Sequence, residues 1–173
     1  MFRQIATMAR RIACLFLLSL PLFTVPAQAT DSMMNRGEYL ARIMDCGGCH
    51  TPGALMGAPE MERQLTGGNV GFAIPGLGIF YPPNLTSDEE TGLGLWTVDE
   101  IVAAIRTGER PDGRVLAPAM PYHAYSAMTD NDARALATYL AGLPAVANSV
   151  PAPVGPDEAA PLPYLTMAMP VSN

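Results

Sequence analysis

Lysine is absent from this sequence, and histidine and cysteine are scarce. All ten basic residues are arginine, and the 173 residues include two histidines, three cysteines and one tryptophan. Nucleic-acid-binding proteins need a basic surface for the phosphates, so a formal net charge of −6 without lysine argues against that class. The few cysteines and histidines restrict any metal or disulfide site to one small cluster. Hydrophobic residues make up 49% of the chain, which is enough for one core at single-domain length.

The N-terminal segment has the composition of an export signal. Three arginines among the first 11 residues are followed by an apolar run at 12–25, and residues 27–29 (Ala-Gln-Ala) match a small-residue cleavage site. The run is shorter than the roughly 20 residues of a membrane-spanning helix, although an uncleaved anchor is the alternative. We therefore expect a cleaved signal peptide at 1–29, which removes Cys14, and a periplasmic mature chain without a membrane span. Its seven arginines against 16 acidic residues give a formal charge of −9.

Three segments of the mature chain carry apolar residues at helical spacing. The segments are 32–45, 98–107 and 130–141. Thr97 and Glu100 form a capping box before the second, and Thr129 is the expected N-cap of the third. Gly108 and Gly142 stand where the second and third helices should end. A fourth, short turn is expected at 46–50.

Long stretches between and after these helices are rich in glycine and proline. Residues 51–96 contain nine glycines and five prolines, residues 111–126 form another loop, and seven prolines follow Leu143. We predict no sheet, a domain at 30–145, and a proline-rich tail at 146–173 that is extended over the surface or partly disordered. Loops of this length are difficult to order in a small domain, so a large apolar prosthetic group would complete the core.

The sequence Cys46-Gly47-Gly48-Cys49-His50 is the attachment pattern of a c-type haem. Two thiols on one helical turn can each add to one vinyl group of the haem, while the histidine reaches the iron. We expect the two glycines to reduce bulk where the backbone approaches the porphyrin. A zinc site would need four ligands, with His123 as the remaining one, and a thioredoxin-like pair would need a βαβ context that is not apparent. The pattern therefore predicts one covalent haem c with its iron bound by His50.

A second axial ligand is expected on the other side of the iron. Met120 lies 70 residues after the motif histidine, between Pro118 and Pro121, which stiffen its loop. A thioether ligand raises the reduction potential of a haem. Met128 and His123 are the alternatives, although Met128 directly precedes an N-cap and is suited to packing as a hydrophobic staple.

Taken in order, these motifs resemble the class I mono-haem cytochromes c, most closely the haem modules in the cytochrome subunits of bacterial periplasmic dehydrogenases. The matching stretches are Cys46–Pro52, Pro83–Asp88, Thr91–Trp96, Ala104–Gly108, Met120–Tyr122 and the final helix ending at Leu140. The resemblance implies an all-α class I cytochrome c fold, with three main helices and long loops wrapped around one covalent haem. It also implies Met120 as axial ligand and a close crossing of the first and last helices at Gly37 and Tyr139. The chain departs from multi-haem members in having one haem motif, and from many soluble cytochromes in lacking lysine.

Several residues are candidates for contacts around the haem. Trp96 and Arg106 are expected to contact the haem propionates, since an arginine suits planar carboxylates. Tyr81 and Asn84 are candidates for the same side. We expect the free ring N–H of His50 to bond to a carbonyl, and in the sequence Pro52 is a plausible acceptor.

These features predict an electron carrier rather than an enzyme. With two axial ligands no iron position is open to a substrate, so electrons would pass from a periplasmic dehydrogenase to another cytochrome or an oxidase. The carrier could also be a fixed electron-transfer subunit of the dehydrogenase. The alternatives are a haem-based sensor or enzyme with a labile sixth ligand, and a haem-free thiol oxidoreductase that uses Cys46 and Cys49.

Overall fold

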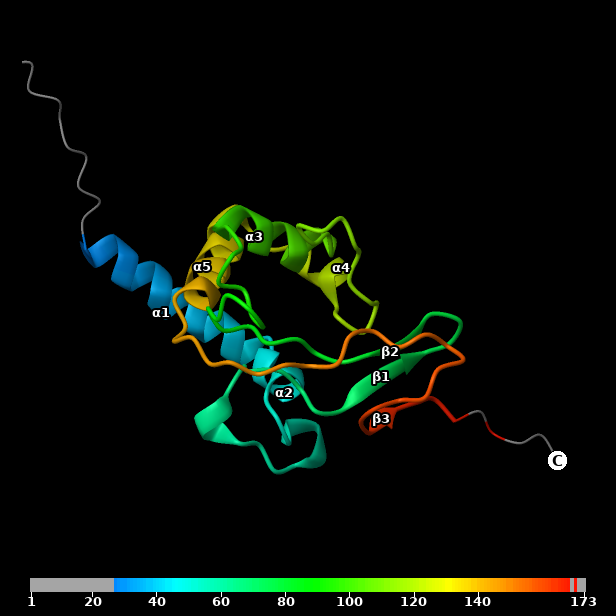
Figure 1. Cartoon of the computed structure of the whole chain (residues 1–173). Helices are drawn as coiled ribbons and strands as arrows, with labels where there is room; N and C mark the ends of the chain where they lie inside the picture. Colours follow the sequence, from blue (N-terminus) through cyan, green and yellow to red (C-terminus); the bar gives the residue numbers. More distant parts are fainter. Residues whose placement is uncertain (1–26, 169, 171–173) are drawn as a thin grey trace, which may run out of the picture.

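The computed structural model describes residues 27–168 and 170, and is rich in helix with a small sheet (Figure 1). The helices are α1 (Ala27–Ile43), α2 (Cys46–His50), α3 (Val98–Thr107), α4 (Tyr122–Tyr125) and α5 (Asp130–Ala141), with short 3-10 turns η1 (Ala54–Met56) and η2 (Met61–Arg63). The strands are β1 (Gly71–Ile74), β2 (Gly78–Phe80) and β3 (Tyr164–Leu165). The described helices include none that is both long and apolar enough to cross a membrane.

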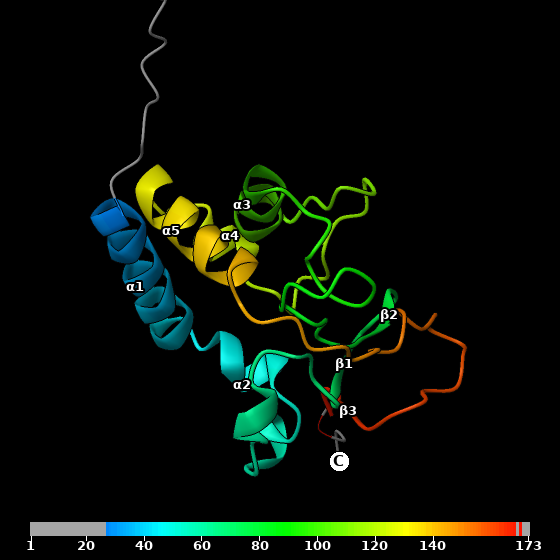
Figure 2. The same ribbon diagram turned by 60° about the vertical axis from the view of Figure 1, so that its left-hand side comes forward.

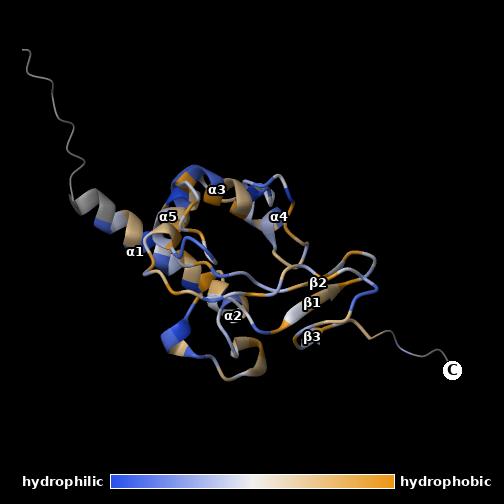
Figure 3. Ribbon diagram, viewed as in Figure 1, coloured by the Kyte–Doolittle hydropathy of each residue, from blue (hydrophilic) through white to orange (hydrophobic). Residues whose placement is uncertain are grey.

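Helices α1 and α5 lie side by side, with α1 on the outside of the molecule (Figure 2). They approach closely at Gly37, which is buried. Only glycine allows this approach, because a Cβ atom there would overlap the carbonyl oxygen of Ala135 and crowd Tyr139. Helix α3 packs against α5 and contributes Ile101 and Ile105 to the core, both less than 7% exposed. The alternation of hydrophobic and hydrophilic residues along α3 is visible in Figure 3.

Two of the three predicted helices have the expected bounds. Thr97 accepts a hydrogen bond from the backbone N–H of Glu100 in a complete capping box, and Gly108 ends α3 at a φ of 78°. Thr129 caps α5 by accepting a hydrogen bond from the backbone N–H of Asp132. Helix α1 instead begins at Ala27, within the expected cleavage site, and ends at Ile43. The signal-peptide residues before Ala27 lie outside the described residues.

The expectation that the chain has no sheet was wrong. Strand β1 pairs antiparallel with β2 and parallel with β3, in the order β2-β1-β3. The strands have four, three and two residues, too few for a period-two pattern to be visible in the sequence. Helix α4 is likewise a single turn within the expected loop 111–126. The fold is therefore helix-rich with a small sheet rather than purely helical.

The C-terminal segment, residues 146–165, lies across the molecule between the helices and the sheet (orange to red in Figure 1). Val154 is 8% exposed and pairs with Ile79 of β2. The hydroxyl of Tyr81 donates to the carbonyl of Leu162 at 2.7 Å. The segment is held to the rest of the fold by hydrogen bonds as far as β3.

Candidate functional site

One cavity of about 610 Å³ lies between the helices, the sheet and the C-terminal segment. Its lining includes Cys46, Cys49 and His50 from α2, Trp96, and Met120. Apolar side chains from α3, α5, β1 and β2 complete most of its wall, and residues 149–153 of the C-terminal segment contribute another part. The cavity therefore brings together residues that are up to about a hundred positions apart in the sequence.

The two cysteines are presented by a sharp change of direction after α1. Asp45 has a left-handed backbone (φ 55°) and separates α1 from α2. Both thiols are free and partly exposed toward the cavity. Burial raises the pKa of the Cys46 thiol to about 11 and also raises that of Cys49. A nucleophilic thiol needs a lowered pKa, so this environment disfavours the thiol oxidoreductase.

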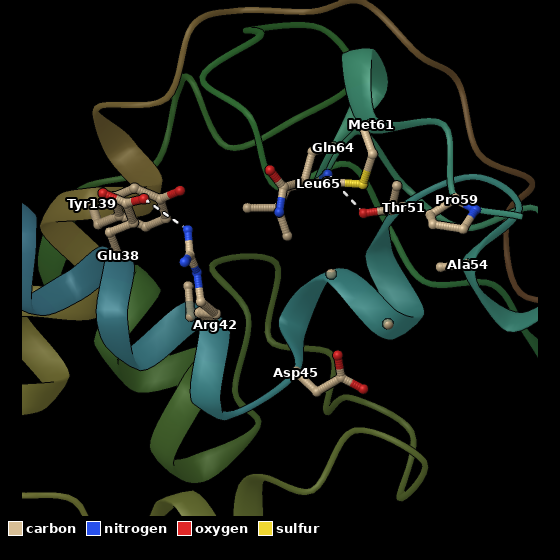
Figure 4. A pocket seen from close by; sticks show the side chains of 13 residues that line it. Glu38, Arg42, Asp45, Thr51, Ala54, Pro59, Met61, Gln64, Leu65 and Tyr139 are labelled. Atoms are coloured by element: carbon tan, nitrogen blue, oxygen red, sulfur yellow. Dashed lines mark hydrogen bonds and ion pairs between the residues drawn. The ribbon is translucent and has the colours of Figure 1, made fainter. Parts of the chain in front are cut away.

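The glycines of the motif do not line this cavity. Gly47 and Gly48 form part of a second hollow of about 420 Å³ on another side of α2, with Glu38, Arg42 and Asp45 (Figure 4). A Cβ atom at Gly48 would overlap the Asp45 carboxylate. The expectation that both glycines make room at the porphyrin edge was therefore wrong.

His50 is held by a carbonyl from a distant loop. Its side chain is buried, with the residue 8% exposed, and Nδ1 lies 2.7 Å from the carbonyl oxygen of Pro83. A carbonyl can only accept, so Nδ1 carries the proton and Nε2 has the free lone pair. Burial lowers the pKa of His50, which keeps the ring neutral. The expected acceptor Pro52 was wrong: its carbonyl accepts from the backbone N–H of Glu60 at 3.0 Å.

Of the three candidates for the second ligand, Met120 alone lines the cavity. Its loop is tightened by two backbone bonds, from the Met120 N–H to Ala117 and from the Tyr122 N–H to Met120. Met128 packs against the helical core instead. His123 is exposed and its ring contacts that of Tyr122, with 4.2 Å between centroids.

The basic residues at the cavity are Arg110 and Arg114, which the sequence analysis did not single out. The guanidinium of Arg110 lies over the Trp96 ring, and both arginines pair with Asp112. Arg106 does not line the cavity and is paired with Asp130 at 2.6 Å. The sequence does contain a signal for these basic residues. Arginines stand on either side of Asp112 in the turn Arg110–Arg114.

Tyr81 lines the cavity, whereas Asn84 is 1% exposed and does not.

The donor set and the shape of the cavity fit a c-type haem. Two free thiols, a neutral histidine with a free Nε2 and a methionine thioether line one largely apolar space, with arginines available for carboxylates. The volume is within the range of roughly 300–1,000 Å³ that is typical of ligand sites. Among the described residues, no group of three or more histidine, cysteine or acidic side chains could hold a metal ion by itself.

Comparison with known proteins finds similar cytochrome subunits, although no family model matches the chain. It is 37% identical over 120 residues to the fructose dehydrogenase cytochrome subunit of Gluconobacter japonicus, covering 69% of this chain and 23% of the relative. It is 38% identical over 126 residues to the cytochrome c subunit of a quinone alcohol dehydrogenase of Gluconobacter oxydans, covering 72% and 24%. The cytochrome c subunit of gluconate 2-dehydrogenase of Pantoea cypripedii is 38% identical over 112 residues, covering 65% and 23%.

The chain thus spans about a quarter of the length of these curated relatives. Its similarity is to cytochrome subunits, and it resembles a haem module of such proteins.

Proposed function

We propose that this chain is a periplasmic c-type cytochrome that carries single electrons through one covalently bound haem. The observation that carries this proposal is the convergence of Cys46, Cys49, His50 and Met120 on one apolar cavity. The similarity to dehydrogenase cytochrome subunits supports it independently. When bound, haem c supplies one-electron chemistry, because its iron alternates between Fe(III) and Fe(II).

The residues of the chain have distinct roles in holding the cofactor. Cys46 and Cys49 form the thioether links, and a single CxxCH motif in the sequence accounts for one haem. His50 binds the iron through Nε2, with its ring fixed by the Pro83 carbonyl. Met120 would supply the second iron ligand from this chain. With His50 and Met120 both holding the iron, no position would be left for a substrate, which favours a carrier over an enzyme.

The propionates are assigned to the part of the cavity that contains Trp96, Arg110 and Arg114. Arginine suits this role because its guanidinium binds a carboxylate in a planar, two-bond geometry. Arg110 is already oriented by Trp96 and Asp112. Arg106, the candidate from the sequence, is engaged by Asp130 away from the cavity lining.

The electron donor is a periplasmic dehydrogenase, and the acceptor is another cytochrome or an oxidase. The donor is inferred from the relatives, whose names pair cytochrome subunits with dehydrogenases. A periplasmic location is inferred from the signal sequence at 1–29. We favour a diffusing carrier over a fixed subunit, and co-elution with a dehydrogenase through a high-salt wash would overturn that preference.

The test is the absorption spectrum of protein exported from a host that matures c-type cytochromes. We expect haem that stays with the chain after denaturation, a low-spin spectrum in both oxidation states, and a thioether-to-iron band in the ferric state. His50→Ala should prevent a stable holoprotein, whereas the matched control His123→Ala should leave the spectrum unchanged. Absence of haem would favour a thiol enzyme, and ready binding of carbon monoxide would favour a sensor.

A further inference from the structure

A fully buried carboxamide lies next to the carbonyl that holds His50. Asn84 directly follows Pro83 and is 1% exposed. Its Oδ1 accepts hydrogen bonds from the backbone N–H of Thr86 at 2.9 Å and from the Thr86 hydroxyl at 2.8 Å. All the acceptor capacity of the side-chain oxygen is used within this turn.

The nitrogen of the same side chain reaches two other segments. Nδ2 donates to the hydroxyl of Thr91 at 3.0 Å and to the carbonyl of Val146 at 2.8 Å. Val146 is the first residue of the C-terminal segment, which contributes part of the cavity wall. Asn84 therefore connects the loop behind His50 to the segment that closes the cavity.

We propose that Asn84 is a positioning residue for the haem ligand His50, holding the Pro83 carbonyl at Nδ1 and tying it to the C-terminal segment. This inference rests on the proposed function, in which His50 binds the iron. The Pro83 carbonyl and the Asn84 nitrogen belong to one planar peptide, so fixing Asn84 limits rotation of that carbonyl. A hydrogen bond to the far nitrogen of a ligating histidine sets the ring orientation and raises its basicity.

The competing explanation is that backbone hydrogen bonds on either side of the Pro83 carbonyl hold it in place without Asn84. The Gly68 N–H donates to the Pro82 carbonyl, and the Leu85 N–H donates to the Leu65 carbonyl, both at 2.9 Å. These bonds hold the residues before and after the Pro83 carbonyl but not the peptide that contains it. If the flanking bonds were sufficient, Asn84 would contribute to stability alone.

Two variants and one control separate these explanations. Asn84→Ala removes all four hydrogen bonds, and Asn84→Ser retains an acceptor that can still close the turn to Thr86 while losing the tie to Val146. The control is Asn148→Ala. Asn148 also anchors the C-terminal segment, because its side chain donates to the Thr66 carbonyl and accepts from Arg63, both at 2.7 Å. Its backbone N–H donates to the Thr91 hydroxyl at 3.0 Å, and the substitution to alanine keeps that bond.

The measurement is exchange of the His50 Nδ1 proton in the reduced holoprotein by NMR, together with the midpoint potential. We expect about tenfold faster exchange in Asn84→Ala, the effect of losing roughly one hydrogen bond. We also expect a higher potential, because a less basic histidine stabilises Fe(III) less. Asn84→Ser should show a smaller change of the same sign, and Asn148→Ala should leave both readouts as in the wild type while still lowering the melting temperature.

The assignment is overturned if Asn84→Ala and Asn148→Ala change exchange and potential equally. If Asn84→Ala gives no holoprotein, Asn84→Ser decides, and exchange equal to that of the control rejects the assignment. A wild-type protein whose His50 ring signals lack any shift from the haem would reject His50 as ligand, and with it both the proposed function and this role. That failure is visible before any variant is made.

Discussion

The guanidinium of Arg110 lies over the ring of Trp96, with its central carbon 4.9 Å from the ring centroid. The two residues come from opposite ends of α3 and meet at the cavity. Stacking of this kind preorganises an arginine and leaves its edge available for a carboxylate. Arg106, on α3 itself, provides a matched comparison because its guanidinium pairs with Asp130 instead.

We expect Arg110→Gln to lower the midpoint potential, whereas Arg106→Gln should leave it unchanged. A positive charge near the haem stabilises the reduced form, and its loss corresponds to roughly tens of millivolts at a distance of several ångströms in a partly hydrated site. Potentiometric titration of both holoproteins measures the difference. An equal effect of the two substitutions would contradict the assignment of Arg110 to the propionates.

Met120→Ala should lose the thioether-to-iron band of the ferric protein and allow the ferrous protein to bind carbon monoxide. The reason is that neither of the two alternative ligands, His123 and Met128, lines the cavity. Met128→Ala is the control: it should retain the spectrum and lose about 1 kcal/mol of unfolding free energy, since Met128 packs only partly buried against the core. Loss of the band in Met128→Ala instead would show that the ligand had been misassigned.

Gly37→Ala should destabilise the protein by about 1–3 kcal/mol, which is typical of overpacking in a close contact. Alanine is intrinsically better than glycine in a helix by about 1 kcal/mol, so the sign of the change depends on the contact with Ala135. Denaturant unfolding of the holoprotein measures it. The control is Asn35→Ala, at an exposed position of α1, which should leave the free energy of unfolding almost unchanged or raise it slightly. A similar rise in the free energy of unfolding for Gly37→Ala would show that α1 and α5 can move apart.

Shortening the C-terminal segment at two points should have different effects on the haem. A chain ending at Asn148 keeps the Val146 carbonyl that Asn84 binds and loses residues 149–153 of the cavity wall, so greater hydration should lower the potential. A chain ending at Ala159 keeps that wall and loses β3 and the Tyr81–Leu162 hydrogen bond. It should be less stable with an almost unchanged potential. Equal potentials for the two chains would mean that the wall does not shield the haem.

Charge should control the rate of electron transfer to small oxidants. Each of the seven arginines among the described residues is paired with a carboxylate, so the excess negative charge is left without a partner. Oxidation by the cation tris(phenanthroline)cobalt(III) should slow as ionic strength rises, because screening shortens from about 30 Å at 0.01 M to about 10 Å at 0.1 M. Stopped-flow oxidation by the anion ferricyanide is the control and should accelerate. Salt effects of the same sign for both oxidants would contradict this charge distribution.

Local signals in the sequence determined the bounds of α3 and α5 and the position of the expected haem-attachment motif. The bounds of α3 and α5 follow from capping residues and apolar spacing within each segment, and these depend on atoms only a few positions apart. The same is true of Cys46, Cys49 and His50, which share one turn of α2. Met120 was identified from its place between two prolines, and the structure places it in the lining of the same cavity.

What surrounds that site was decided by tertiary contacts. The acceptor for His50 is Pro83, 33 residues away, and not the adjacent Pro52. The strands are too short to form alone and are stabilised by pairing, one of them with a segment some ninety residues later in the chain. The cations at the cavity are Arg110 and Arg114 and not Arg106, because Arg110 lies over Trp96 whereas Arg106 is paired with Asp130. Sequence alone therefore specified the two thiols and the two iron ligands that we propose for the haem. The groups that orient and enclose it were set by packing between distant segments, whose geometry is not encoded in any short stretch of the chain.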